Sequence, residues 1–397
     1  MSADFWPTAA PGLVAGNRLQ LLESGGEYFP ALIAAIDAAR REVHLETYIF
    51  DDDVTGRRVA AALASAARRG VAVRVLVDGF GARDFSTGLG AVLAADGVEV
   101  MVYRPEAGRY AFRRHRLRRM HRKLAVVDGG TAFVGGINVV DDFDDGRELA
   151  PRFDYAVRIE GPLAVTVHLA VRHVWRLVRW ARLGRRPPPP AELPPPPPVA
   201  GTTSAALLVR DNLRHRRDIE NAYLAAIQSA RQRVVIANAY FLPGRTFRKA
   251  LVAAARRGVR VDLLLQGRPD HLMLHFATLS LYDRLMVAGI RIFEYEKAYL
   301  HAKVAVVDGD WATVGSSNID PLSLLLAREA NVVVRGAEFA AQLLASLDAA
   351  MADAAREVHH KDHRHRSWLT RVASAAAYGL VRFMVGVTRY AGNQYRG

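Results

Sequence analysis

The feature that most constrains this 397-residue chain is an internal duplication. The segment AAIDAARREVHLETYIF (Ala34–Phe50) returns as AAIQSARQRVVIANAYF (Ala225–Phe241), and HRKLAVVDG (His121–Gly129) returns as HAKVAVVDG (His301–Gly309). Both pairs keep their order along the chain, so one unit of structure occurs twice. We therefore expect two related halves.

Helical and strand-like patterns alternate within the duplicated unit. Ala31–Arg40 has the apolar spacing of a helix, and Val43–Phe50 is rich in β-branched and aromatic residues. Val59–Arg69 is typical of an Ala-rich helix that ends at Gly70. This alternation predicts an α/β fold in which helices cover both faces of a sheet.

A proline-rich segment, Arg185–Pro198, separates the two halves and contains nine of the 18 prolines. Such a run favours an extended linker, with recognition by another protein as the alternative. We predict a first half at residues 1–184, a linker at 185–203, a second half at 204–357 and a basic, apolar tail at 358–397.

Composition excludes several classes of protein. The chain has no cysteine, which excludes disulfides, thiolate metal sites and cysteine nucleophiles. Arg382 interrupts the most apolar run, Val372–Val387, and Met1–Leu21 lacks a secretory signal pattern. The net charge of +14 predicts an anionic partner such as nucleic acid, a phosphorylated ligand or an acidic membrane surface. A cytoplasmic or membrane-surface protein is expected.

The chemistry is concentrated in a repeated His-x-Lys-x4-Asp pattern, formed by His121, Lys123 and Asp128 and again by His301, Lys303 and Asp308. Positions i and i+2 of a strand share a face, so the histidine and lysine of each copy project together. Lysine binds phosphate as a point charge, and histidine serves as nucleophile or proton donor. Only five of the 54 basic residues are lysines, and two of the five occur in this pattern.

Small and amide residues follow each motif, namely Gly135, Gly136 and Asn138, then Gly315, Ser316, Ser317 and Asn318. Glycine lets backbone approach a ligand closely, and serine and asparagine donate to phosphate oxygens. We expect substrate contacts from Gly136, Asn138, Ser316 and Asn318. An ordinary turn is the alternative for the glycines.

Two carboxylates occupy matching places further along, Asp154 in FDYAVRI and Glu329 in REANVVV. A carboxylate can hold an imidazole in the tautomer that catalysis needs. We expect Asp154 to orient His121 and Glu329 to orient His301, each within its own half. Ordinary strand-end charges are the alternative, and Glu46 stays unassigned because its counterpart in the second half is apolar or an amide.

These motifs resemble the phospholipase D superfamily, whose mark is HxKx4D followed by small residues and Asn. Within it, HLETYIFDDD, YFLPG (Tyr240–Gly244) and DYAVRIEGP (Asp154–Pro162) resemble bacterial cardiolipin synthases of the short type, which lack N-terminal membrane spans. The resemblance covers about Arg18–Glu357. It implies two similar α-β-α sandwiches with one active site at their interface, in which Asp128 and Asp308 brace the motifs.

The resemblance also implies a reaction. One histidine attacks phosphorus to form a phosphohistidine, and the other protonates the leaving oxygen and then activates the incoming alcohol. By analogy, His121 is the nucleophile and His301 the acid, and both lysines stabilise the charge on phosphate oxygens. The scheme needs no metal or cofactor. The expected activity is phosphatidyl transfer between two phosphatidylglycerol molecules, with phosphatidylethanolamine as another candidate substrate.

Two other activities remain open. Phospholipase D hydrolysis uses the same covalent step with water or another alcohol as acceptor. A nuclease of the same superfamily would explain the positive charge, but few aromatic residues accompany the basic run, only Tyr103, Tyr110 and Phe112. We expect no nucleic-acid partner, and the sequence identifies no protein partner.

Three basic or apolar segments suggest contact with an anionic membrane surface on the cytoplasmic side. They are the Arg104–Lys123 run, a basic amphipathic helix at Val167–Leu183 and the tail Trp368–Tyr390. The alternatives are a solvated loop, a helix packed on its own domain through Val167, Val171, Val174 and Val178, and a packed terminal helix. The His359–His365 stretch could bind metal adventitiously.

Overall fold

The computed structural model describes residues 12–105, 119–143, 150–184, 194, 197–211, 214–268, 271–320, 327–361 and 367–387. Most of the predicted linker, most of the Arg104–Lys123 run, residues 362–365 of the histidine-rich stretch and the last ten residues lie outside these ranges.

The first half of the chain alternates strands and helices, as predicted. Its elements are β1 (Val14–Glu23), α1 (Ser24–Asp37), β2 (Glu42–Thr47), α2 (Val54–Arg68), β3 (Ala72–Asp78), α3 (Leu89–Ala95), β4 (Glu99–Tyr103), β5 (Lys123–Val127), β6 (Thr131–Gly135), β7 (Tyr155–Glu160) and α4 (Leu163–Leu183).

The second half repeats this order. Its elements are β8 (Thr203–Arg210), α5 (Asp218–Ser229), β9 (Arg233–Asn238), α6 (Arg245–Arg256), β10 (Arg260–Gln266), α7 (Leu272–Val287), β11 (Arg291–Tyr295), β12 (Lys303–Val307), β13 (Trp311–Gly315), β14 (Glu329–Arg335), α9 (Ala337–Asp353) and β15 (Ala355–Glu357). A further helix, α11 (Trp368–Val387), follows.

The described strands form one sheet in the order β15-β11-β10-β9-β12-β13-β14-β8-β1-β7-β6-β5-β2-β3-β4. β1 and β8 are equivalent strands and lie side by side. Outward from them, β7, β6, β5, β2, β3 and β4 on one side match β14, β13, β12, β9, β10 and β11 on the other, as a duplicated unit requires. β1 and β8 pair antiparallel with a break in register between Val14 and Asn17. The buried Asn17 side chain bonds across this seam to the Thr203 carbonyl and accepts from the Leu163 amide.

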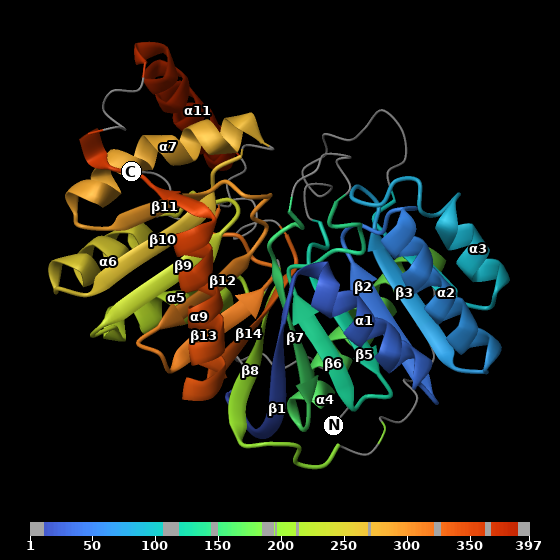
Figure 1. The fold of residues 1–397 in the computed structure, drawn as a ribbon. Helices are drawn as coiled ribbons and strands as arrows, with labels where there is room; N and C mark the ends of the chain where they lie inside the picture. The colour runs from blue at the N-terminus through green and yellow to red at the C-terminus, as the bar shows by residue number, and fades with distance from the viewer. Residues whose placement is uncertain are drawn as a thin grey trace.

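Helices cover both faces of the sheet, which confirms the predicted α/β class (Figure 1). One core joins α1, α2 and α3 to the first-half strands, and another joins α5, α6 and α7 to the second-half strands. A third core lies under α4 and α9 and includes strands of both halves. This shared core fixes the two halves against each other.

Helix α4 has the amphipathic pattern expected at Val167–Leu183. Val167, Val171, Val174 and Val178 are all buried against the sheet, so the apolar face packs on the protein's own core. Of the two alternatives for this helix, the structure therefore has the packed one.

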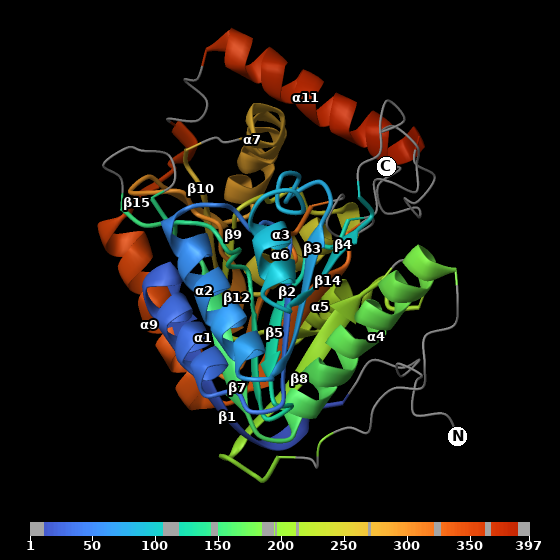
Figure 2. The ribbon, with the colours of Figure 1, turned by 90° about the vertical axis from the view of Figure 1, so that its right-hand side faces the viewer.

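Helix α11 lies outside the sheet and crosses α7 (Figure 2). Val381, Ala377 and Tyr378 pack on the second-half core, while the opposite side of the helix carries exposed apolar residues. None of the helices in the described part of the chain has the length and apolarity that a bilayer crossing needs.

Candidate active site

Both histidines lie two residues before a strand whose five residues are all buried. His121 precedes β5 and His301 precedes β12. The motif lysines are the first residues of these strands and are themselves buried, Lys123 at 3% and Lys303 at 0% exposure. The imidazole side chains remain 17% and 18% exposed, so a ligand can reach them.

Backbone hydrogen bonds join each histidine segment to the opposite half. The His121 amide donates to the Arg328 carbonyl over 2.9 Å, and the Arg328 amide donates to the Arg119 carbonyl over 2.7 Å. The His301 amide donates to the Phe153 carbonyl over 2.8 Å, and the Phe153 amide donates to the Tyr299 carbonyl over 2.9 Å. The residue after Arg328 is Glu329, and the residue after Phe153 is Asp154.

The carboxylates consequently pair across the two halves. His121 Nδ1 lies 3.1 Å from Glu329 Oε1 and 3.2 Å from Glu329 Oε2, and His301 Nδ1 lies 2.6 Å from Asp154 Oδ2. The expectation that Asp154 orients His121 and Glu329 orients His301 is wrong. Within each half, a full strand (β6 or β13) separates the histidine strand from the carboxylate strand, a gap of about 10 Å.

The lysine ammonium groups lie beside the histidine backbones. Lys123 Nζ donates to the His121 carbonyl over 2.6 Å, and Lys303 Nζ donates to the His301 carbonyl. Lys303 Nζ also lies 3.7 Å from Asp154 Oδ2. The pKa of Lys123 is lowered to about 7, chiefly by burial, with Lys303 contributing to the decrease and Glu329 opposing it.

Burial also shifts the pKa values of the histidines and of Asp154. It lowers the pKa of His121, against the opposing effect of Glu329, and lowers that of His301 far below its ordinary value. Lys123 and Lys303 each lower the pKa of both histidines, so the two motifs share one electrostatic environment. Burial raises the pKa of Asp154 to about 6, while Lys303 opposes this rise.

These shifts favour neutral imidazoles at neutral pH. Assigning the proton to Nδ1 lets each ring donate to its carboxylate and leaves a lone pair on Nε2. A neutral Nε2 can act as a nucleophile or a base. The buried ammonium groups supply positive charge for an anionic phosphate.

The small residues after each motif serve the carboxylates. A Cβ atom added to Gly136 would overlap the Asp154 carboxylate. The equivalent residue Ser316 instead donates from Oγ to Glu329 Oε2 over 2.5 Å. Gly136 thus leaves space for the carboxylate of Asp154, while Ser316 holds the carboxylate of Glu329 through a hydrogen bond.

The two motif asparagines are both buried at 3% exposure. Asn138 Oδ1 accepts from the Ile49 amide over 3.2 Å. Asn318 Oδ1 has no hydrogen-bond partner among the described residues. The nearby Asn238 Oδ1 accepts from the Ile319 amide over 3.1 Å.

Asp128 and Asp308 lie at the far ends of β5 and β12, away from the imidazoles. The Asp128 carboxylate accepts from the amides of residues 40, 41 and 42, and the Asp308 carboxylate accepts from those of residues 231, 232 and 233. Both aspartates have left-handed backbone, with φ of 51° and 50°. Each carboxylate therefore ties the motif hairpin to the start of β2 or β9.

Sequence reasoning missed Tyr48 as a neighbour of the site. Its half-buried ring has its centroid 4.8 Å from that of His121, and Lys123 Nζ lies 5.4 Å from its ring centre. The equivalent residue in the second half is Ala239. A tyrosine in one copy opposite an alanine in the other is visible in the sequence and could have indicated that Tyr48 has a role of its own.

A group that could hold a metal ion, formed by Glu42, His44 and His168, lies at the start of β2, whereas the candidate site lies beyond its end. Arg74 Nη1 lies 3.1 Å from Glu42 Oε2 and 3.3 Å from His44 Nε2. A guanidinium already occupies that side of the cluster.

Comparisons with known proteins agree with this geometry. The family model described as "Cardiolipin synthase, PLD-like domain" matches residues 32–162 and 223–351, which contain both motifs. Cardiolipin synthase B of Escherichia coli (strain K12) is 39% identical over 92% of this chain and 88% of its own length. The probable cardiolipin synthase YwiE of Bacillus subtilis (strain 168) is 31% identical over 81% of this chain and 63% of its own.

Solved structures show the same fold at low sequence identity. The phosphatidylserine synthase of Haemophilus influenzae Rd KW20 has a TM-score of 0.68 at 14% identity and covers 96% of this chain and 97% of its own. The polyphosphate kinase of Porphyromonas gingivalis has a TM-score of 0.58 at 18% identity and covers 93% of this chain and 53% of its own. From the family match and the extent of the identity, the chain belongs to the cardiolipin synthase family of the phospholipase D superfamily.

Proposed function

We propose that this protein transfers the phosphatidyl group of one phosphatidylglycerol molecule to the hydroxyl group of a second, producing cardiolipin and glycerol. The observation that carries this proposal is the pair of crossed histidine–carboxylate contacts, His121 with Glu329 and His301 with Asp154. The names of the relatives support the same reaction.

In the proposed first step, His121 Nε2 attacks phosphorus and forms a P–N bond while the P–O bond to glycerol breaks. The anionic phosphate beside His301 favours the charged form of its ring, which then carries a proton on both nitrogens and gives the Nε2 proton to the departing oxygen. In the second step, neutral His301 takes the proton of the incoming hydroxyl, whose oxygen attacks phosphorus and displaces His121. Both histidines return to their starting states. The reaction consumes no cofactor.

The proposed division of roles is supported by the different settings of the two rings. Ser316 and His121 together hold Glu329, which suits a nucleophile that must stay in one orientation. His301 is 2.6 Å from Asp154, whose pKa is raised to about 6, so that pair suits proton exchange near neutral pH. Lys123 and Lys303 would stabilise the charge on phosphate oxygens, together with Asn138 and Asn318.

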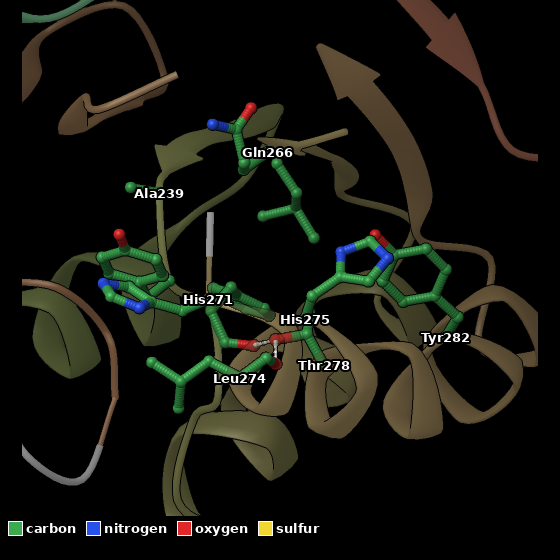
Figure 3. Close-up of a pocket in the computed structure, with 10 residues that line it drawn as sticks. Ala239, Gln266, His271, Leu274, His275, Thr278 and Tyr282 are labelled. Atoms are coloured by element: carbon green, nitrogen blue, oxygen red, sulfur yellow. Dashed lines mark hydrogen bonds between the residues drawn. The ribbon is translucent and has the colours of Figure 1, made fainter. Parts of the chain in front are cut away.

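We propose that the acceptor headgroup enters the open pocket drawn in Figure 3, which has about 330 Å³ of empty space. Gln266 Oε1 in this pocket accepts from the Leu300 amide, one residue before His301. His271 and His275 of the α7 region and Tyr282 add polar edges among apolar residues. A polar, uncharged headgroup such as glycerol matches this lining, and a filled pocket would keep water away from the phosphoenzyme.

The proposed location is the cytoplasmic membrane surface, reached through α11. Leu369, Val372, Leu380 and Phe383 lie on one side of this helix and are 50–68% exposed. An apolar helix face beside a phospholipid enzyme, on a chain of net charge +14, matches an anionic bilayer as its partner.

The activity is tested by incubating the purified protein with phosphatidylglycerol, with and without phosphatidylethanolamine, and identifying the products by mass spectrometry. Cardiolipin with released glycerol is expected. Phosphatidic acid as the main product would instead identify a phospholipase D hydrolase. No lipid product, with cleavage of DNA or RNA, would identify a nuclease and reject the proposal.

A further inference from the structure

A second polar pocket lies behind the candidate active site, between α4 and the ends of β8 and β5. It is open to solvent, with about 300 Å³ of empty space, and is lined by Arg122, Ala170, His173, Val174, Val209, Arg210, Asp211 and Arg328. We call it the arginine pocket. Arg122 and Arg210 are 4% and 2% exposed, so two guanidinium groups are almost completely buried there.

Three of the four charged side chains that line this pocket are arginines, and the fourth is Asp211. Arg122 forms a two-point contact with Glu46, with Nε–Oε2 and Nη2–Oε1 distances of 2.5 and 2.8 Å. Arg210 donates to the Ala327 carbonyl, and Arg328 Nε donates to the Tyr103 hydroxyl over 3.3 Å. Asp211 is the carboxylate in the lining, and its Oδ1 already accepts from two backbone amides.

The positive charge of Arg122 and Arg328 also affects the pKa of His173. The pKa of His173 is lowered to about 4, chiefly by burial, with Arg122 and Arg328 contributing to the decrease and Asp211 opposing it. Burial also lowers the pKa of Arg210 to about 10 even though Glu329 opposes the change. An anion in the pocket would relieve both effects.

The duplication provides an internal control, because the second copy of the unit lacks this feature. Superposing the repeats through strand register and sequence places Ala302 at the position of Arg122, Ser24 at Arg210, Phe153 at Arg328 and Ala237 at Glu46. At the equivalent place, the Phe153 ring stacks on Tyr295 with centroids 5.1 Å apart and planes 11° apart. The repeated fold therefore forms with neutral residues at these positions and does not itself require the buried arginines.

We propose that the arginine pocket binds the phosphate group of a second anion, supplied by a lipid headgroup or by free phosphate. Guanidinium groups bind phosphate oxygens in pairs, and the pocket opens to solvent, so a substituent on the phosphate can extend outward. The reaction proposed above uses none of these three arginine side chains, so this site is additional to it.

The pocket is joined to His121 through the backbone. Arg122 follows His121 directly, the Arg328 carbonyl accepts from the His121 amide, and Glu329 holds the His121 ring. An anion that holds Arg122 and Arg328 together therefore stabilises the segment that orients His121. The orientation of His121 therefore depends on whether an anion occupies the arginine pocket, although that anion does not contact the reacting phosphorus.

The test is equilibrium dialysis of the full chain against radiolabelled inorganic phosphate at low ionic strength. A Lys303→Gln background weakens phosphate binding at the candidate active site, and one strong binding event per chain is expected to remain. Adding Arg210→Gln or Arg328→Gln should weaken that event roughly tenfold or more. The control is Arg182→Gln, which removes the same charge from an exposed position on α4 and should leave it unchanged.

Unchanged phosphate affinity in both arginine variants would overturn the proposal, as would an equal loss in the Arg182→Gln control. Folding of each variant is checked by its melting temperature without phosphate. A second measurement, amide hydrogen exchange, uses the Lys303→Gln protein with its arginine pocket intact. Added phosphate should slow exchange of the backbone amides around Arg328 and of the α4 residues near His173. No slowing there would also reject the site.

A second arm identifies the source of the phosphate group. Phosphatidylcholine vesicles with or without phosphatidylglycerol are added to the phosphate-loaded Lys303→Gln protein. Displacement only by the anionic vesicles assigns a lipid headgroup, and retention with both kinds of vesicle assigns free phosphate. Because binding is measured without turnover, this result is independent of which reaction the enzyme catalyses.

Discussion

His301 Nδ1 lies 2.6 Å from Asp154 Oδ2, although the two residues are 147 positions apart and belong to different copies of the duplicated unit. The equivalent contact joins His121 to Glu329 in the opposite direction. Each half therefore supplies the histidine of one pair and the carboxylate of the other. Neither half alone contains a complete pair, which gives a physical reason for both copies to stay in one chain.

The first prediction concerns pH. Asp154, with a raised pKa of about 6, must be ionised to accept from His301, so activity should fall as the pH drops below about 6. Lys123, with a lowered pKa of about 7, must be protonated to bind phosphate, so kcat/KM should fall above about 7. The measurement is a kcat/KM profile with short-chain phosphatidylglycerol.

Substrate should shift the alkaline limb of that profile. A bound phosphate favours the charged form of Lys123, so the limb should lie at higher pH in kcat than in kcat/KM. Lys123→Arg keeps its charge throughout and should remove the limb. A profile that is flat between pH 5 and 9 would show that neither group controls turnover.

The second prediction concerns the small residues beneath the carboxylates. Gly136→Ala places a Cβ atom in the space of the Asp154 carboxylate and should reduce kcat at least a hundredfold, because Asp154 moves away from His301. Gly130→Ala serves as control, since a Cβ there meets no atom within 4 Å. Near-normal kcat for Gly136→Ala would show that the Asp154 position is not critical.

The third prediction separates stability from chemistry. Asp308→Ala leaves three backbone amides without their acceptor and should lower the free energy of unfolding by about 1–3 kcal/mol. Asp308→Asn keeps an acceptor and tolerates the left-handed backbone, so it should lose less. Thermal unfolding measures both. Equal losses would indicate that the negative charge itself is what matters.

The same contact has a pH dependence. The backbone amides lower the pKa of Asp308, so its contribution to stability is present above the ordinary pKa of 3.8 and is lost as the pH falls through the lower folded value. The difference in melting temperature between wild type and Asp308→Ala should therefore be constant at neutral pH and shrink at strongly acidic pH.

The fourth prediction concerns α11. Leu380→Glu with Phe383→Glu places charge on the exposed side of the helix and should reduce flotation with phosphatidylglycerol vesicles, while turnover in detergent micelles changes little. Val54→Glu is the matched control, because Val54 is 69% exposed on a different helix. Undiminished flotation of the α11 variant would assign membrane contact to another surface.

Much of this architecture follows from local sequence. The two-residue spacing of histidine and lysine, the buried AVV segments and the glycine stops are properties of single strands and helices, and they predict the α/β class and the repeat. The positions of Asp128 and Asp308 at the strand ends are also local, whereas the backbone amides that they brace belong to the start of another strand.

The crossed pairing was not predictable in the same way, because it depends on how the two halves dock. Asp154 follows His121 in the same half of the chain, yet β6 lies between their strands in the sheet. Tyr48 and the arginine pocket were missed for another reason. A duplication is recognised by the positions that the two copies share, whereas these residues are positions where the two copies differ.

The central claim is that His121 works with Glu329 and His301 with Asp154, and a burst measurement tests it most directly. Phosphatidyl-p-nitrophenol releases a leaving group that needs no acid, so only the nucleophilic half-reaction is required for the burst of p-nitrophenol. We expect His301→Ala and Asp154→Asn to keep the burst. His121→Ala should abolish it, and Glu329→Gln should strongly slow it. Loss of the burst in both His121→Ala and Asp154→Asn, with a normal burst in Glu329→Gln, would contradict the crossed assignment.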